Sequence, residues 1–400
     1  MTNQTYHSDV CIVGNGAVGK AAALGFSQAG LRVTILSAAA PVAARVLEEW
    51  DVRVFALNHV AHDLLASLKV WDAMDQSRVA AVDAMQVLGC DGSNKSGGAL
   101  GFDAYGAHIE ELAWIVEDRN LNQALDSALK FARNVTQVTG QAKRLDVSGQ
   151  QASVTLENGD VLTASLMVGA DGAQSWLRGQ CDIGIDYRSY GQRGVVTNFF
   201  CEKPHRGVAH QWFVEDLGII ALLPLPGQRV SLVWSAPDAL AQELMREPLS
   251  ALAERLAPYC AEALGALIPL QPEEIKAFPL QLIRPHSIVG PRVALIGDAA
   301  HVVHPLAGHG MNLGFGDVTA LLAQVNGRED HRDCGDPRVL SRYRRARREE
   351  VTMMQVTTDG LARLFASDLE PIRMARNVGL NLLNHLPVLK RKLIAHAMGK

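Results

Sequence analysis

Three glycines near the start of the sequence have the spacing of a nucleotide-binding loop. Gly14, Gly16 and Gly19 form the pattern G-x-G-x-x-G between an apolar run, DVCIV, and a stretch of small residues, AAALGFSQAG. Glycines at these positions allow a tight turn and bring backbone N–H groups and the helix dipole onto a pyrophosphate. The pattern predicts a dinucleotide site; a glycine turn that only packs a helix on a strand is the simpler alternative.

A dinucleotide site usually has an acidic residue at the end of its second strand, and this sequence lacks it. The second strand is expected in LRVTIL, and the residue that follows is Ser37. A serine hydroxyl can bond a ribose oxygen, but it makes a neutral contact where a carboxylate would make a charge-assisted one. We therefore expect Ser37 to be a weaker ribose contact than the usual acid.

Two longer segments are more specific than the glycine loop: LMVGADGAQSWLR at 166–178 and RVALIGDAAHVVHPLAGHGMNLGFGDV at 292–318. With DVRVFALN at 51–58, they resemble the FAD-dependent aromatic hydroxylase (monooxygenase) family, in which a G-x-G-x-x-G, a D-G and a G-D motif surround one FAD. The segments 343–365 and 373–399 are similar to the ubiquinone-biosynthesis hydroxylase branch. The similarity is weakest at 76–110 and 181–285.

The resemblance implies roles for particular residues. Asp171 and Gly172 would approach the FAD phosphates, Arg53 would contact the flavin, and Asp298, after Gly297, would bond the ribityl chain. The isoalloxazine edge would rest on a loop and helix start that offer free N–H groups to an anionic flavin, with Pro305, Gly308, Gly310, Met311 and Asn312. His309 and Gly316 stand where relatives commonly carry Gln and Arg.

The resemblance supports three further FAD contacts less strongly. Glu117 and Asp118 lie where the family has a polar FAD contact, and Arg178 is a cation near the D-G motif. Four of the residues assigned by resemblance have a simpler alternative: an N-cap for Asp118 or Asp298, and a surface ion pair for Arg53 or Arg178.

The resemblance also implies the reaction. FAD would be the cofactor, NAD(P)H the co-substrate, and a flavin C4a-hydroperoxide formed with O2 would hydroxylate the ring of a polyprenylated phenol or benzoquinol of ubiquinone biosynthesis. No protein nucleophile is needed, and no catalytic residue is assigned. Two alternatives stay open: hydroxylation of a small soluble phenol, and a non-catalytic flavin-binding scaffold of a biosynthetic complex.

The elements that must position these residues follow from periodicity. A βαβ unit opens the chain, ENGD predicts a hairpin turn, RVALIGDAA predicts a buried strand running into a helix, and 190–235 alternates as a sheet with one exposed face. We expect an α/β fold: a Rossmann-like FAD-binding domain (1–75, 105–180 and 286–340), an inserted sheet-based substrate domain (76–104 and 181–285), and a helical C-terminal segment (341–400).

Composition excludes several classes of protein. With 400 residues, 48% apolar and 20% charged, the chain is globular, and a net charge of −4 disfavours a nucleic-acid partner. Six cysteines without a C-x-x-C pair fit neither a zinc site nor a disulfide framework. Asp298, His301 and His304 do not share one helical face, so no metal site is expected.

The sequence also bears on membranes. No apolar run of about 20 residues is present, and the polar start lacks the basic region of a signal peptide, which predicts a cytoplasmic protein. Residues 371–400 carry six cations and no acid, interleaved with apolar residues. Such a segment either docks on the FAD domain or lies on the inner face of an anionic membrane as a peripheral anchor.

Overall fold

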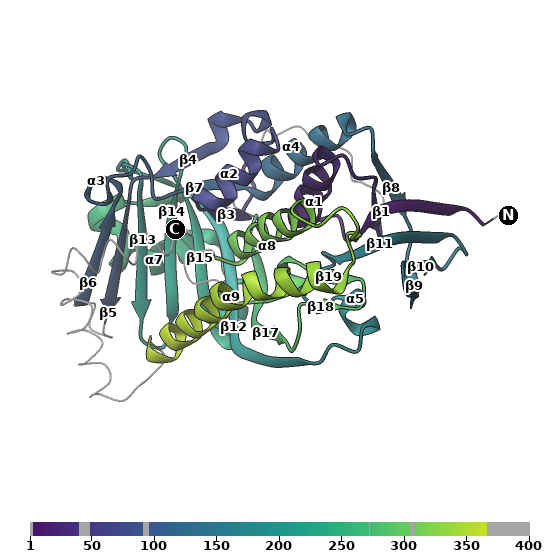
Figure 1. Cartoon of the computed structure of the whole chain (residues 1–400). Coiled ribbons are helices and arrows are strands. Elements are labelled where there is room, and N and C mark those ends of the chain that lie inside the picture. The colour runs from purple at the N-terminus through teal and green to yellow at the C-terminus, as the bar shows by residue number, and fades with distance from the viewer. Residues whose placement is uncertain (1–2, 40–48, 91–95, 272, 305–308, 366–400) are drawn as a thin grey trace.

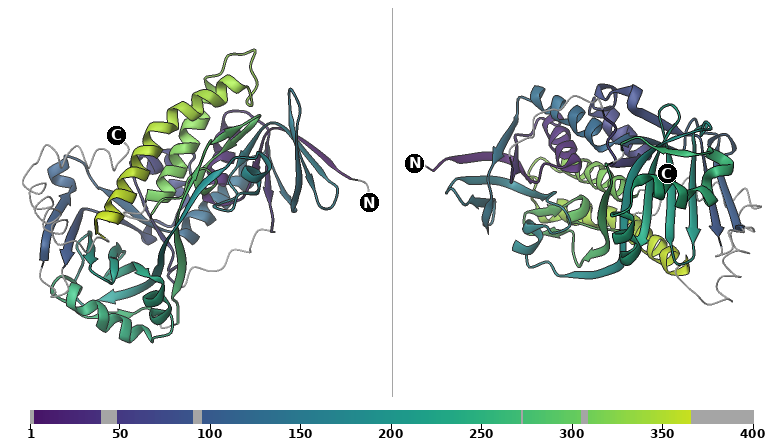
Figure 2. Two further views of the ribbon diagram at one scale, coloured as in Figure 1. Left: turned by 90° about the horizontal axis from the view of Figure 1, so that it is seen from below. Right: turned by 180° about the vertical axis from the view of Figure 1, so that it is seen from behind.

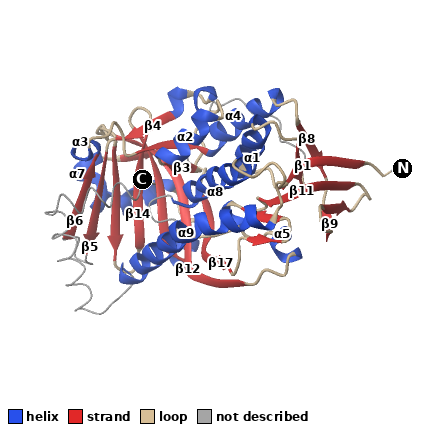
Figure 3. Ribbon diagram, viewed as in Figure 1, coloured by secondary structure: helices blue, strands red, loops and turns tan. Residues whose placement is uncertain are grey.

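The computed structural model describes residues 3–39, 49–90, 96–271, 273–304 and 309–365. Two eight-stranded sheets lie at opposite ends of the molecule, and helices pack against both (Figures 1 and 3). The N-terminal end lies at the end far from the second sheet, as the views in Figure 2 also show.

The first sheet has the order β18-β19-β11-β1-β2-β8, and β10 and β9 continue it from the first half of β11. β1, β2, β8, β11 and β19 are parallel. The bounds are β1 Thr5–Val13, β2 Val33–Ser37, β8 Val135–Thr139, β9 Ala142–Val147, β10 Ala152–Leu156, β11 Val161–Gly169, β18 Val289–Gly290 and β19 Val293–Leu295.

The apolar run in β1 is continuous because both faces of this sheet are covered. Val10 and Ile12 pack with the helices on one face, whereas Cys11 and Val13 pack with α5 and the β9–β10 hairpin on the other. The helices are α1 Ala17–Gln28, α2 His59–Ser67, α4 Asp118–Phe131, α5 Trp176–Gln180, α8 His309–Asn326 and α9 Pro337–Phe365.

The second sheet has the order β16-β12-β15-β14-β13-β5-β6, with β17 paired to β12. Helices α6 Asp238–Leu244 and α7 Leu249–Leu264 cover one face. The strands are β5 Ala84–Cys90, β6 Ser96–Asp103, β12 Ile185–Cys201, β13 Val208–Val214, β14 Gly218–Leu225, β15 Arg229–Pro237, β16 Leu267–Pro269 and β17 Lys276–Pro285.

The other face of the second sheet meets a small sheet, β3-β7-β4, that belongs with the helices of the first domain. Its strands are β3 Val54–Leu57, β4 Val79–Val82 and β7 Ala113–Glu117. Ala209 and Leu225 from the large sheet pack on Ala80 and Ile115 from the small one. This apolar contact joins the two halves of the molecule.

The expected fold class is confirmed, and two details differ from expectation. The segment 76–104 divides between the two sheets, since β4 pairs with β7 while β5 and β6 join the large sheet. RVALIGDAA runs from the buried strand β19 into a short 3-10 helix, Gly297–Ala299, and not into an α-helix. The glycine prevents a regular continuation, because Gly297 has a φ of +60°.

The predicted helical C-terminal segment is present as α9 up to Phe365, and residues 366–400 lie outside the described residues. α9 runs from the edge of the first sheet across to the second (Figures 1 and 2). In the part of the chain that the structure describes, no helix combines the length and apolar character needed to cross a membrane.

Candidate FAD site

The glycine loop connects β1 to α1, and two of its glycines are required by close packing. A Cβ on Gly14, whose φ is +112°, would lie 2.2 Å from the carbonyl oxygen of Ala170. A Cβ on Gly19 would lie 2.5 Å from the carbonyl oxygen of Gly14. At Gly16, the N-cap of α1, a Cβ would meet no protein atom within 4 Å. This open space at a helix N-terminus is what a pyrophosphate requires.

Backbone hydrogen bonds align the three motifs at one edge of the first sheet. The Ala170 amide donates to the carbonyl of Val13 at 2.8 Å, and the Ile296 amide donates to the carbonyl of Gly169 at 2.9 Å. The G-x-G-x-x-G, D-G and G-D motifs each follow one of these strand ends. They therefore meet at the carboxyl edge, where α/β proteins bind ligands.

Asp298 projects from the turn after β19. Its side chain is exposed, yet protein atoms surround it closely enough for desolvation to raise the pKa of its carboxyl, against the opposing effects of His301 and Arg53. Arg53 is thus an electrostatic neighbour of Asp298. A second carboxylate, Asp118, lies 3.8 Å from the Arg53 guanidinium, and burial also raises its pKa.

Two aromatic rings from different domains flank Arg53. The guanidinium carbon lies 5.4 Å from the ring centroid of Phe55 in β3 and 5.6 Å from that of Phe278 in β17. Phe278 is 40% exposed, which is unusual for a large apolar side chain. Arg53 therefore lies at the boundary between the FAD-binding half and the second sheet.

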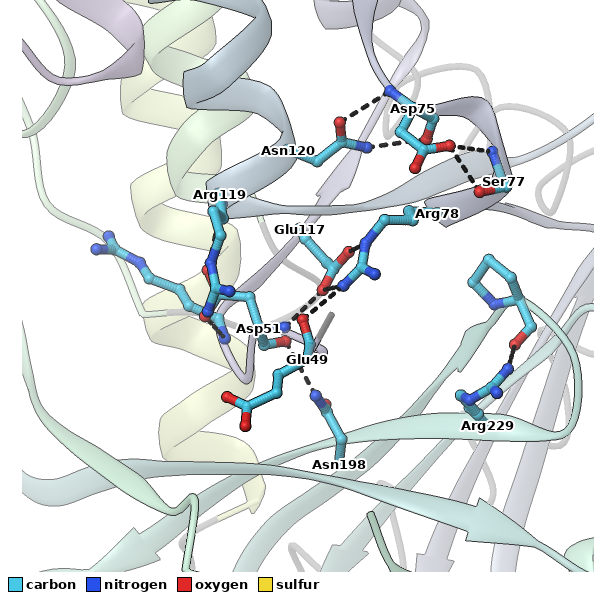
Figure 4. Close-up of polar contacts among 12 residues, drawn as sticks. Glu49, Asp51, Asp75, Ser77, Arg78, Glu117, Arg119, Asn120, Asn198 and Arg229 are labelled. Atoms are coloured by element: carbon cyan, nitrogen blue, oxygen red, sulfur yellow. Dashed lines mark hydrogen bonds and ion pairs between the residues drawn. The ribbon is translucent and has the colours of Figure 1, made fainter. Parts of the chain in front are cut away.

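A buried ion pair supports the segment that carries Arg53 (Figure 4). Arg78 donates to both carboxylate oxygens of Glu117, from Nε at 2.6 Å and from Nη2 at 2.8 Å, and Glu117 is only 1% exposed. Glu117 also accepts the Asp51 amide at 2.5 Å. The Arg78 guanidinium lies 4.3 Å from the ring centroid of Trp50. Residues 50 and 51 are thereby fixed to β7.

Asp51 connects this buried ion pair to the backbone of Arg53. Its carboxylate accepts the amide of Arg53 at 3.1 Å and that of Arg119 at 3.2 Å, while its carbonyl accepts the Asn198 side chain at 3.0 Å (Figure 4). Because Asn198 belongs to β12, this contact also ties the loop to the second sheet. The backbone around Arg53 is therefore held from three elements.

The structure corrects the roles expected of Glu117 and Arg178. Glu117 is enclosed by Arg78 and the Asp51 amide, so it supports the site from behind and is not a surface for FAD. Arg178 is buried and donates to the carbonyls of Ala173 and Ala299 at 2.7 and 3.0 Å. It links the D-G segment to the G-D turn and is not a free cation beside phosphates.

The other residues predicted to contact FAD differ in whether their polar groups are already used in hydrogen bonds within the protein. The Ser37 hydroxyl donates to the Ala39 carbonyl at 2.5 Å, which leaves its lone pairs for a ribose hydroxyl. Asn312 uses its side chain to bond the Ala56 carbonyl and the Asn58 amide, at 2.8 and 3.0 Å. Gly310 and Met311 are partly exposed at the start of α8, and Pro305 and Gly308 lie outside the described residues.

FAD fits these residues on two observations besides the open space at Gly16. Asp171 accepts the Leu177 amide with one carboxylate oxygen, while its other oxygen, Oδ1, is buried without a hydrogen-bond partner among the described residues. Gly172 has a φ of +83°, and a Cβ there would meet nothing within 4 Å. The D-G motif thus has open backbone next to the glycine loop, and an unpaired acceptor that fits a hydroxyl or N–H group of FAD and not its phosphates, which have no donor.

Comparison with known proteins identifies the class. A family model described as an FAD binding domain matches residues 7–357. Among solved structures, p-nitrophenol 4-monooxygenase PnpA from Pseudomonas putida superposes with a TM-score of 0.77 at 18% identity, over 99% of this chain and 98% of that one. HpxO from Klebsiella pneumoniae, complexed with FAD and uric acid, has a TM-score of 0.73 at 17% identity, over 97% of both chains. The family model and the site define an FAD-binding protein, and its fold is that of these solved flavoproteins.

Sequence relatives narrow the class. The chain is 34% identical to 3-demethoxyubiquinol 3-hydroxylase of Escherichia coli over 100% of both chains. It is 33% identical to ubiquinone hydroxylase UbiL of Rhodospirillum rubrum, over 98% of this chain and 90% of the relative. A mitochondrial ubiquinone biosynthesis monooxygenase of Danio rerio is 30% identical over 99% and 90%. The chain belongs to the ubiquinone-biosynthesis branch of the FAD-dependent aromatic hydroxylases.

We predict that Asp298→Ala lowers FAD occupancy while the chain stays folded, because the exposed carboxylate is available to a ligand. The ratio of flavin to protein absorbance after gel filtration measures occupancy, and far-UV circular dichroism checks the fold. Asp146→Ala, which removes an exposed carboxylate paired with Arg144, is the control. Full FAD retention in Asp298→Ala would show that this residue is not a cofactor contact.

We predict that Arg78→Ala lowers the free energy of unfolding by about 3–5 kcal/mol, because it leaves the Glu117 carboxylate buried without its cation. Arg144→Ala removes an exposed ion pair and should change that free energy by less than about 1 kcal/mol. Urea denaturation of the two variants compares the losses. Equal losses would mean that the buried pair contributes no more than a surface one.

Proposed function

We propose that the protein hydroxylates the aromatic ring of a polyprenylated phenol or benzoquinol intermediate of ubiquinone biosynthesis, with NAD(P)H as reductant and O2 as oxidant. The names of its relatives support the pathway. The observation that carries the substrate class is the apolar face of the second sheet, which meets the FAD-binding half at the small sheet.

That apolar face extends over several strands. Leu223 and Leu225 of β14 contribute to the cluster at the small sheet, and Ile219 of the same strand packs with Phe213 farther along the face. Val87 of β5 and Leu100 of β6 belong to the same apolar cluster as Phe213 and Ile219. Most of these side chains are buried against their neighbours. A site formed among them would have apolar walls, which suit a long hydrocarbon tail better than a small soluble phenol.

Bound FAD supplies the redox chemistry: reduced by NAD(P)H, it activates O2 for transfer of one oxygen atom to an electron-rich ring. The protein itself binds FAD and orients it relative to the substrate. The glycine loop holds the pyrophosphate, Asp298 the ribityl chain, and the N-terminus of α8 offers its dipole to the flavin. Arg53, Phe55 and Phe278 line the boundary at which the substrate ring would enter, and the two aromatic rings help to exclude water.

The test is to identify the quinone intermediate that accumulates without this protein. We predict that mass spectrometry of a strain lacking it finds a prenylated intermediate short of one or more ring hydroxyls. The wild-type gene should restore ubiquinone, and the Asp298→Ala gene should restore less. A normal quinone profile in the deletion strain would contradict the proposal.

Assays on the purified flavoprotein separate the alternatives. A hydroxylase of prenylated rings oxidises NAD(P)H in step with product formation, and kcat/KM falls when the prenyl tail is removed. A hydroxylase of small phenols prefers the tail-free ring. A scaffold binds FAD but forms no hydroxylated product with either compound.

Access to a lipid substrate is a separate question, and residues 371–400, which lie outside the described residues, bear on it. We propose that they bind an anionic membrane surface, where each cation contributes about 1 kcal/mol. We predict salt-sensitive flotation with anionic liposomes that decreases when Lys390, Arg391 and Lys392 are changed to Ala, with FAD content unchanged. Flotation that is absent at low salt, or indifferent to the triple change, would point to delivery by partner proteins of a biosynthetic complex.

A further inference from the structure

The buried carboxylate of Asp317 contacts the G-D turn at both ends of the turn. Asp317 of α8 is 0% exposed, and its Oδ2 accepts the amide of Gly297 at 2.9 Å. The same oxygen lies 2.6 Å from Nε2 of His301. Asp298 lies between these two attachment points, so the position of Asp317 sets where the Asp298 side chain can lie.

Asp317 is in turn held by one arginine of α9. Arg347, which is 3% exposed, donates from Nε to Oδ1 of Asp317 at 2.7 Å and from Nη2 to the carbonyl of Leu313 at 3.1 Å. Glu350 pairs with its remaining nitrogen. Burial alone would raise the pKa of Asp317, but His301 and Arg347 hold it below its usual value, which keeps the carboxylate ionised.

The helix that carries Arg347 is anchored on both sides of this contact. The Tyr343 hydroxyl donates to the carbonyl of Leu295 in β19 at 2.8 Å. Farther along α9, Gln355 accepts Nε of Arg284 at 2.9 Å, and Asp359 pairs with Arg188 of β12. These contacts fix the backbone of α9, and with it the position of the Arg347 side chain, relative to both large sheets.

We propose that Asp317 and Arg347 are positioning residues for FAD binding, which act by holding the G-D turn in the conformation that presents Asp298 to the cofactor. A lysine at 347 would keep the charge but could not reach Asp317, Leu313 and Glu350 together, because it lacks the planar fork of arginine. Because Arg347→Lys keeps a cation beside the buried Asp317 carboxylate, the change should affect the geometry of the turn, and hence FAD affinity, more than stability. The proposal rests on FAD binding alone and not on the substrate.

The experiment compares Arg347→Lys with Arg342→Lys, a matched change on the same helix at a residue that pairs with Glu329 near the surface. Full-length proteins are purified with added FAD, and the dissociation constant is measured from flavin fluorescence recovered on dilution. Arg347→Lys should weaken FAD binding about tenfold, the scale for loss of a partner that orients a ligand-binding side chain. Arg342→Lys should leave it unchanged.

The decisive measurement repeats Arg347→Lys in an Asp298→Ala background. If Arg347 acts through Asp298, its effect on the FAD dissociation constant shrinks there, whereas a general loss of structure weakens binding by the same factor in both backgrounds. A coupling of about threefold or more between the two changes supports the proposal, and a smaller coupling overturns it. If Arg347→Lys does not fold, Asp317→Asn takes its place in the same cycle, judged by the same threshold.

Discussion

The parallel pairing of β1, β11 and β19 is the constraint on which the cofactor site depends. Each strand is followed by one motif, and the motifs lie far apart in the sequence, at Gly14, Asp171 and Asp298. Because the strands run parallel and in register, their carboxyl ends share one edge, and the ladder continues through the Ala170 and Ile296 amides into the motifs. A slip in this register would separate the motifs, whatever the conformation of each loop.

What the sequence predicts well is what depends on neighbouring residues. The βαβ opening, the hairpin at ENGD and the strand ends that carry the motifs all have local patterns, and the structure has them. What it could not predict depends on partners distant in the chain. Arg78 has no local signal, and its bond to Glu117, 39 residues away, turns an expected FAD contact into a buried support. Asp317 lies within a family-like segment, but only its contact with Arg347 shows what it holds.

The two halves of the molecule are joined by polar groups as well as by apolar packing. The carbonyl of Asp51 accepts a hydrogen bond from the Asn198 side chain in the second sheet, and the Arg53 guanidinium contacts the ring of Phe278 in the same sheet. Residues next to the cofactor site are therefore fixed partly by the sheet that would bind the substrate. A hydroxylase benefits from this arrangement, because oxygen transfer needs the flavin and the ring in a defined relation and a site that excludes water.

The place of Arg347 along the chain has a consequence for biosynthesis. All three cofactor motifs are synthesised before this residue, which lies in the first half of α9. A nascent chain that ends before it has the phosphate loop and the strand edge but lacks the cation that neutralises the buried Asp317 carboxylate. Until that point the Asp317 carboxylate lacks its arginine partner. If Arg347 positions the G-D turn as proposed, the FAD-binding conformation of this turn is complete only after the part of α9 that carries Arg347 has been made.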